Sequence, residues 1–349
     1  MILPESLHAD WINSNREKFH ADPIIIEKVI RALALLEALQ LVGLNFIFKG
    51  GTSLMLMIQE PRRFSIDIDI IIEDKEQDIE ALLEKVVAST DFVKWEEKIR
   101  PPKSGIEKRH FKLFYTPQTK QDGDINNILL DIVFEVNPYI ETQEIEVSHF
   151  LLSEKGERIK VITPTLEAIL GDKLTAYGPN TTGVPLSKPK EVLKQIYDVA
   201  SIFDRILSLN GVRENFIKVA HGELAYKGLD PNNFQLIIDD IVDSSYNFCT
   251  NGKIDKDTFK TMQSGVSNLA GFIYGEKFRE PQAQIAVAKA SYIVKQIERN
   301  KTDIERFDKS VDMKSWVIKD HNYSFLNKLK KHNLEAFHYW YKTLQEHEY

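Results

Sequence analysis

Gly50, Gly51, Asp67 and Asp69 have the residue types and the spacing that phosphate chemistry requires. They occur in FKGGTSLMLMIQEPRRFSIDIDIII, residues 48–72, where the two aspartates alternate with isoleucines. Aspartate is a poor strand former, so a sheet built only for packing would not place two aspartates in such a run. Alternate residues of a strand share a face, which predicts that Asp67 and Asp69 project together, away from the isoleucines.

A second strand pattern, at residues 129–136, repeats this arrangement. Asp131 and Glu135 fall on one face, and the predicted apolar face holds Leu130, Ile132, Phe134 and Val136. If the two strands are neighbours, Asp67, Asp69 and Asp131 converge on one patch of the sheet, where carboxylates without a cation would repel one another. Oxygen ligands suit Mg²⁺, and two such ions about 3.5 to 4 Å apart could clamp both oxygens of an in-line phosphoryl displacement. These three aspartates are the predicted metal ligands.

The Gly50-Gly51 turn predicts a phosphate cradle. Glycines let backbone amides approach a phosphate, a helix that follows them turns its positive end toward it, and Ser53 can donate a hydrogen bond. A cradle and a set of metal ligands thus lie within one strand-turn-helix-strand unit.

The elements that must position these groups follow from hydrophobic periodicity. The predicted strands are 45–50, 65–72, 109–116 and 127–136, and the predicted helices in this half are 23–43, 52–59 and 75–89. From Thr163 onward almost everything is predicted to be helical, with Thr163 as a cap before Pro164 and Gly178-Pro179 as the stop. Residues 178–189 are expected to form a mobile loop. The aromatic residues of 337–344 are expected to form a packing face.

Length and composition limit the number of hydrophobic cores and the class of protein. A chain of 349 residues is long enough for two cores, because one core stops growing at about 250 to 300 residues. Neither an apolar run of membrane-spanning length nor an export signal is found, and Cys249 is the only cysteine, so a cytoplasmic protein without a disulfide is expected. The nine histidines show no zinc-binding spacing. The formal charge of −7 argues against a protein that coats nucleic acid.

The motifs together resemble a known group of enzymes. KGGTSL, then RFSIDID, then a later strand with Asp131 are similar to the DNA polymerase β-type nucleotidyltransferase superfamily. More narrowly, Arg63-Phe64-Ser65-x-Asp67-x-Asp69 after Lys49-Gly50-Gly51-Thr52 resembles the AbiEii/AbiGii toxin family of abortive-infection and toxin–antitoxin systems. That family also carries a helical lysine and a later helical aspartate, matched by Lys173 in LGDKLTAYG and Asp198 in KQIYDVA.

The resemblance implies a fold and a set of site residues. It implies an α+β chain, in which a mixed β-sheet nucleotidyltransferase domain with N-terminal helices (1–160) precedes a mostly α-helical domain (161–349) that completes the nucleotide site. The catalytic residues would be Asp67, Asp69, Asp131, Lys173 and Asp198. The nucleotide-binding residues would be Lys49, Gly50, Gly51, Thr52, Ser53, Arg63 and Ser65.

The resemblance also implies a reaction. Asp67 and Asp69 would hold Mg²⁺ against the triphosphate of an NTP, and Asp131 would help to bind a second ion and take the proton of the acceptor hydroxyl. The acceptor would be an RNA, with the 3′ end of a tRNA as the expected case, and a cognate antitoxin would neutralise the toxin. Two alternatives stay open: transfer to a protein hydroxyl, and a member of the fold that binds nucleotide or protein without catalysis.

The sequence departs from the family pattern before Asp198, where an arginine is common and Lys194-Gln195 stands here. Lys188, Lys190 and Lys194 are expected to replace it as point charges. With Lys155, Arg158 and Lys160, these lysines are also expected to form a basic rim for RNA on an acidic protein. Lys173 itself is expected to be an exposed helix residue whose loss changes stability by no more than about 0.5 kcal/mol.

Overall fold

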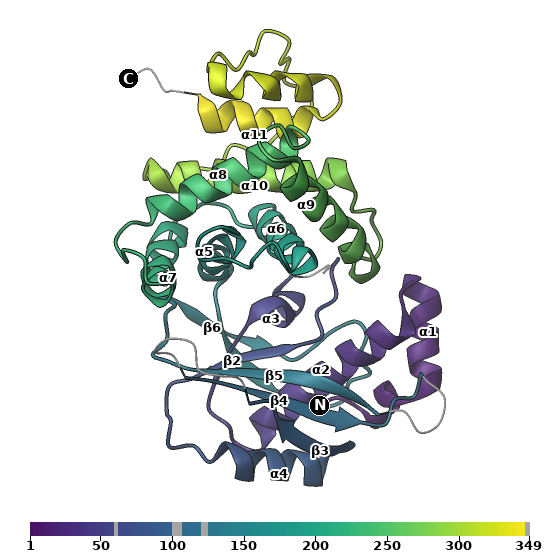
Figure 1. Ribbon diagram of the computed structural model, residues 1–349. Coiled ribbons are helices and arrows are strands. Elements are labelled where there is room, and N and C mark those ends of the chain that lie inside the picture. The colour runs from purple at the N-terminus through teal and green to yellow at the C-terminus, as the bar shows by residue number, and fades with distance from the viewer. Residues whose placement is uncertain (59–61, 100–106, 120–124, 346–349) are drawn as a thin grey trace. The chain divides into compact units, whose positions relative to one another are not determined.

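The computed structural model describes residues 1–58, 62–99, 107–119 and 125–345 (Figure 1). The chain divides into two compact units. The first, called the sheet unit, comprises Met1–Thr165 together with Gly271–Lys277, and the second, called the helical unit, comprises Leu166–Ala270 and the residues from Phe278 onward. Nothing in the sequence indicated that Gly271–Lys277 returns to the sheet unit.

The sheet unit is built on one mixed sheet. Among the described residues it has seven strands in the order β3-β4-β5-β2-β1-β7-β6, in which the pairs β2/β5 and β1/β7 are parallel and the other pairs are antiparallel. The strands are β1 Ile47–Lys49, β2 Ile68–Ile72, β3 Phe92–Glu97, β4 Glu107–Tyr115, β5 Asn126–Phe134, β6 Thr142–Glu146 and β7 Lys160–Pro164. The predicted α+β class with a mixed sheet is confirmed. The strands β3, β6 and β7 were not predicted.

Helices precede and connect the strands of this unit, and two of them begin at a capping aspartate. They are η1 Pro4–Leu7, α1 Ala9–Phe19, α2 Pro23–Leu41, α3 Gly50–Met57 and α4 Ile79–Ser89. The side chain of Asp22 accepts a hydrogen bond from the amide of Ile24 at the start of α2, and Asp78 accepts one from Ala81 at the start of α4. In Figure 1, α3 and α4 lie on opposite faces of the sheet.

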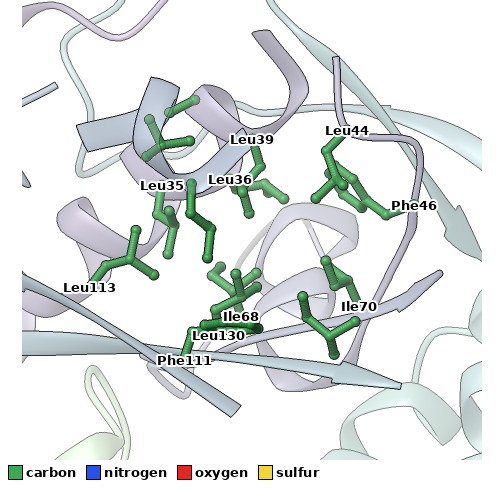
Figure 2. Close-up of a cluster of buried hydrophobic side chains, with 14 of the residues drawn as sticks. Leu35, Leu36, Leu39, Leu44, Phe46, Ile68, Ile70, Phe111, Leu113 and Leu130 are labelled. Carbon is green, nitrogen blue, oxygen red and sulfur yellow. The ribbon is translucent and has the colours of Figure 1, made fainter. Parts of the chain in front are cut away.

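One face of the sheet is covered by an apolar core. Figure 2 shows leucines of α2 packed against side chains from β2, β4 and β5. The labelled residues are Leu35, Leu36, Leu39, Leu44, Phe46, Ile68, Ile70, Phe111, Leu113 and Leu130, each no more than 6% exposed. Burying one such side chain stabilises the fold by roughly 1.5 to 3 kcal/mol, so this packing fixes which face of each strand is turned inward.

The predicted apolar face of β5 is only partly correct. Leu130, Ile132 and Phe134 are buried, but Val136 is 82% exposed. The strand ends at Phe134, so the two-residue alternation no longer applies two positions later.

A second core holds the segment that leads into β2. The backbone amide of Phe64 donates to the carbonyl of Phe272 at 2.8 Å, and the amide of Tyr274 donates to the carbonyl of Arg62 at 2.9 Å. The ring of Tyr274 stacks on that of Phe64 at 4.4 Å and 16°. The returning segment Gly271–Lys277 therefore fixes the backbone just before Asp67.

The helical unit is mostly helical, as predicted, although residues 299–320 form no helix. Its helices are α5 Leu166–Tyr177, α6 Pro189–Phe203, α7 Val212–Tyr226, α8 Gln235–Cys249, α9 Lys256–Leu269, α10 Glu280–Glu298, η3 His321–Lys331 and α11 Leu334–Leu344, and η2 Ala270–Phe272 links α9 to the returning segment. Phe337, Tyr339 and Trp340 are buried, which confirms the packing face predicted for 337–344. No helix in the described ranges is both long enough and apolar enough to cross a bilayer.

One local prediction at the boundary before this unit is wrong. Thr163 and Pro164 do not open a helix, because they pair with Gln143 and Thr142 as the end of β7. The loop expected to be mobile is anchored in its first half. The carboxylate of Asp240 accepts hydrogen bonds from Asn180 and Thr181 at 2.7 to 2.9 Å, and Thr182 donates to a backbone carbonyl of α5.

Candidate active site

Strand register places four polar residues in a row across the sheet. Lys49 of β1 is paired with Asp69 of β2, Asp69 with Asp131 of β5, and Asp131 with His110 of β4. Paired residues on neighbouring strands project to the same face. Because Ile68, Ile70 and Leu130 fill the core on the other face, the row occupies the face that α2 and α4 leave uncovered. We call these four residues the polar row.

Asp67 lies just before β2, outside the polar row, and its backbone is bonded to the helix that follows the glycine turn. Asp67 and Asp69 are both half-buried, and the isoleucine between them is fully buried, as the alternation predicted. The backbone carbonyl of Asp67 accepts a hydrogen bond from the hydroxyl of Thr52 at 2.6 Å. The start of α3 and the start of β2 are thus tied together.

The two glycines allow a close approach that other residues would block. Gly50 has φ +84°, a conformation that side chains rarely adopt, and a Cβ atom there would lie 2.3 Å from Oδ2 of Asp69. A Cβ atom at Gly51 would lie 2.6 Å from Nη2 of Arg63 and 2.8 Å from Oγ of Ser65. The turn therefore brings its backbone against a carboxylate and a guanidinium of the same motif.

Other predicted nucleotide-binding residues are buried around this turn. The hydroxyl of Ser53 is fully buried and donates to the carbonyl of Gly50 at 2.9 Å. Arg63 is 6% exposed, and its Nη1 donates to the carbonyl of Phe64 at 3.1 Å. Ser65 is also buried, whereas Lys49 is half-buried with its Nζ 5.7 Å from the ring centre of Tyr139.

His110 is the residue of the polar row that the sequence analysis missed. Its Nδ1 lies 2.7 Å from Oδ1 of Asp131, and the two side chains are 15% and 34% exposed. The signal was present in RHFKLFYT, because Phe111, Leu113 and Tyr115 are the apolar alternation and His110 falls on the opposite face. What the sequence did not contain was the β4/β5 register that sets His110 beside Asp131.

In the helical unit, Lys173 of α5 and Asp198 of α6 form a buried ion pair. Nζ of Lys173 lies 3.0 Å from Oδ2 of Asp198 and donates to Oε1 of Gln195, also at 3.0 Å. Their side chains are 9% and 4% exposed, so the expectation of an exposed Lys173 is wrong. Gln195 is a neutral hydrogen-bond partner of this lysine.

The predicted basic rim is largely paired with acidic groups. Arg158 contacts Glu146 and Glu154, and Lys160 contacts Glu144. Lys190 and Lys194 both contact Glu191. Most of the positive charge expected there is therefore compensated within the chain.

The family model described as the nucleotidyl transferase AbiEii toxin of type IV toxin–antitoxin systems matches residues 33–265, about two thirds of the chain. The chain belongs to the AbiEii family. It is accordingly a nucleotidyltransferase toxin of a toxin–antitoxin system, and the family implies an NTP substrate. The matched range contains the polar row, the glycine turn and the Lys173–Asp198 pair of this AbiEii chain.

Three solved structures are among those that match this chain. MenT4, a nucleotidyltransferase toxin from Mycobacterium tuberculosis, is 11% identical with a TM-score of 0.48, covering 90% of this AbiEii chain and 94% of its own. JHP933 from Helicobacter pylori is 14% identical with a TM-score of 0.45, covering 78% and 93%. A putative nucleotidyltransferase from H. pylori is 14% identical with a TM-score of 0.41, covering 79% and 94%. No curated protein sequence matches the chain.

Proposed function

We propose that this AbiEii-family enzyme transfers a nucleotidyl group from an NTP to a hydroxyl group of RNA, with Mg²⁺ as cofactor, pyrophosphate as the leaving product and the 3′ end of tRNA as acceptor. The observation that carries the proposal is the polar row. Two neighbouring carboxylates on the face of the sheet opposite α2 and α4, beside a glycine turn, form a donor set that suits phosphoryl transfer.

The donor set fits magnesium in its chemistry. Asp67, Asp69 and Asp131 offer only oxygen atoms, which Mg²⁺ prefers. Within the described parts of the chain, no three His, Cys, Asp or Glu side chains are gathered closely enough to hold a metal ion by themselves. Mg²⁺ is commonly held by one or two carboxylates plus substrate phosphates and water, so the aspartates and the NTP would share its coordination. When bound, the ion would neutralise charge that develops on the phosphate oxygens.

The transfer step is assigned to the chain's own residues. The oxygen of the acceptor hydroxyl forms a bond to the α-phosphorus, the bond from that phosphorus to the bridging oxygen of the β-phosphate breaks, and pyrophosphate leaves. The proton of the acceptor hydroxyl passes to Asp131. His110, at 2.7 Å from Asp131, would hold that carboxylate in position.

Phosphate binding is assigned to the glycine turn and to the basic residues of the motifs. The hydroxyls of Thr52 and Ser53 already donate to backbone carbonyls, so these residues would contribute through the amides at the start of α3. Arg63 and Lys49 supply positive charge on the same unit. Lys173, oriented by Asp198 and Gln195, would bind phosphate from the helical unit.

The experiment that tests this proposal separates the possible acceptors. The enzyme is incubated with each labelled NTP in turn, with Mg²⁺ and with total cellular RNA and protein, and the labelled product is resolved on gels. Label on RNA, lost when Mg²⁺ is chelated, is the expected result. Label on a protein would show that the acceptor is a protein hydroxyl and not RNA. No label with any NTP would favour a member of the fold that binds nucleotide or protein without catalysis.

The proposed partner that limits this activity is a cognate antitoxin. Production of the toxin alone should arrest growth, and production of the antitoxin with it should restore growth. Growth arrest by an Asp69→Asn variant equal to that by the wild type would contradict the link between nucleotidyl transfer and toxicity.

A further inference from the structure

Helix η3 exposes one of its three faces. It is a 3₁₀-helix of 11 residues, and at 3.0 residues per turn the side chains at positions i and i+3 lie directly above one another. Leu326 and Leu329 are buried on one face. Phe325, Lys328 and Lys331 form another face, and all three are exposed. We call these three residues the η3 column.

The remaining face of η3 anchors the preceding loop. Asn327 accepts a hydrogen bond from the amide of Ile318 and donates to the carbonyl of the same residue, both at 2.9 Å. Lys330 donates to the backbone carbonyls of Lys314 and Trp316. Two of the three faces of η3 thus have packing or anchoring roles, and the column is the face that is exposed along the helix.

An exposed aromatic ring at the centre of this surface lies close to ammonium groups. The ring of Phe325 is 39% exposed. Nζ of Lys328 lies over the ring, 4.8 Å from its centre, and Nζ of Lys253, from the turn between α8 and α9, lies over it at 4.3 Å. An exposed aromatic ring and two mobile ammonium groups therefore share one small surface.

The charge of this surface is not compensated within the described part of the chain. Lys253, Lys328 and Lys331 form no ion pair with any described residue, in contrast to the lysines at 160, 190 and 194, which contact glutamates. Residues 309–331 contain six lysines and two aspartates, a formal charge of +4 in a chain whose total is −7. Uncompensated lysines are the ones that can neutralise phosphates and so release the cations condensed on a nucleic acid.

We propose that the η3 column with Lys253 is a docking surface for the single-stranded part of an RNA. The lysines bind phosphates of the RNA, and one of its bases stacks on Phe325. A positive surface that also presents an aromatic ring is the arrangement with which proteins bind single strands independently of sequence. An acidic protein would use the charges but would not need an exposed ring beside them. The inference rests on the proposed function in that the bound RNA would be the acceptor.

RNA binding is measured without catalysis, by the fluorescence anisotropy of a labelled single-stranded oligoribonucleotide with the full-length protein in EDTA and without NTP. The test variant is Lys253→Gln/Lys328→Gln/Lys331→Gln. The control variant, Lys75→Gln/Lys94→Gln/Lys260→Gln, loses the same charge at exposed lysines that have acidic partners. A third variant, Phe325→Leu, keeps an apolar side chain and removes the aromatic ring.

The wild type should bind more weakly as salt rises from about 50 to 200 mM, so that log K falls with log salt. In the test variant this negative slope should be smaller in magnitude by about 2, because each of three lost phosphate contacts contributes about 0.7. The control should keep the wild-type slope. Phe325→Leu should weaken binding at least about fivefold with the slope unchanged.

Three results would overturn the inference: an unchanged slope in the test variant, an equal loss in the control, or undiminished binding by Phe325→Leu together with full displacement of RNA by poly-glutamate. The last result would assign the surface to an acidic protein. Because no NTP is present, a lack of transfer to RNA in the separate labelling experiment would refute the proposed acceptor and leave this binding result standing.

Discussion

Asp69 and Asp131 lie side by side on neighbouring strands of the sheet unit, whereas Lys173 and Asp198 in the helical unit form an ion pair of opposite charges. Like charges directly opposite one another on a sheet are destabilising, so packing alone does not account for the first arrangement. A buried ion pair compensates its own charges, so the second can contribute to folding whether or not it binds substrate. Stability and activity should therefore respond differently to substitutions in the two regions.

The largest effect on stability is expected in the helical unit. Lys173→Met should lower the free energy of unfolding by about 3 to 5 kcal/mol, because it leaves the Asp198 carboxylate buried without its cation. The double variant Lys173→Met/Asp198→Leu should recover most of that loss. Urea unfolding of both variants measures the difference. If Lys173→Met were as stable as the wild type, the pair would have no structural role and the contrast between the two regions would fail.

The next effect concerns the polar row. His110→Ala should lower the turnover rate about 10- to 100-fold, the usual cost of removing a group that orients a catalytic ligand, while the melting temperature stays close to that of the wild type. His110→Asn, which can place an amide nitrogen near Asp131, should restore part of the rate. Steady-state kinetics with saturating NTP measures both variants. Full activity of the alanine variant, or equal losses in both variants, would contradict a positioning role.

A third effect, seen on acidification, concerns the folding of the sheet unit and not the polar row. Burial lowers the pKa of His149 in the sheet unit from 6.5 to about 3. Between these values the unfolded chain binds a proton that the folded chain does not, so stability should fall as the pH is lowered from about 6.5 toward 3, by up to about 1.4 kcal/mol per pH unit.

His149→Asn is the matched variant for this dependence on pH. It keeps an acceptor for the amide of Leu151, which lies 3.3 Å from Nδ1 of His149, and it cannot be protonated in this range. The melting temperature of the variant should fall less on acidification than that of the wild type. An identical pH dependence would show that other groups control acid unfolding.

The site motif and the carboxylate strands could be predicted from the sequence because they depend on local rules. The alternation in SIDIDIII and in NILLDIVF is set by the two-residue period of a strand, and the structure buries Ile68, Ile70, Leu130 and Ile132 accordingly. The glycine turn was predicted for its conformational freedom, which φ +84° at Gly50 bears out.

What could not be predicted depends on contacts between distant segments. The partner of Asp131 is set by the register of β4 and β5, which one sequence does not contain. The burial of Lys173 depends on α5 meeting α6, and a lysine in a helical pattern carries no sign of it. The return of Gly271–Lys277 to pair with Arg62–Phe64 joins positions about two hundred residues apart and left no local signature.

Asp69→Asn tests the central claim, that the polar row is the site of nucleotidyl transfer. The same preparation is assayed for transfer of labelled nucleotide to RNA and for thermal unfolding, with Glu144→Gln, a carboxylate on β6 paired with Lys160, as the control. Transfer should fall by about a thousandfold, since metal-assisted stabilisation is worth several kcal/mol, and the melting temperature should stay close to that of the wild type because the substitution keeps the size of this half-buried side chain. Wild-type transfer by Asp69→Asn would contradict the claim, and so would a loss of transfer that is matched by unfolding or shared by the control.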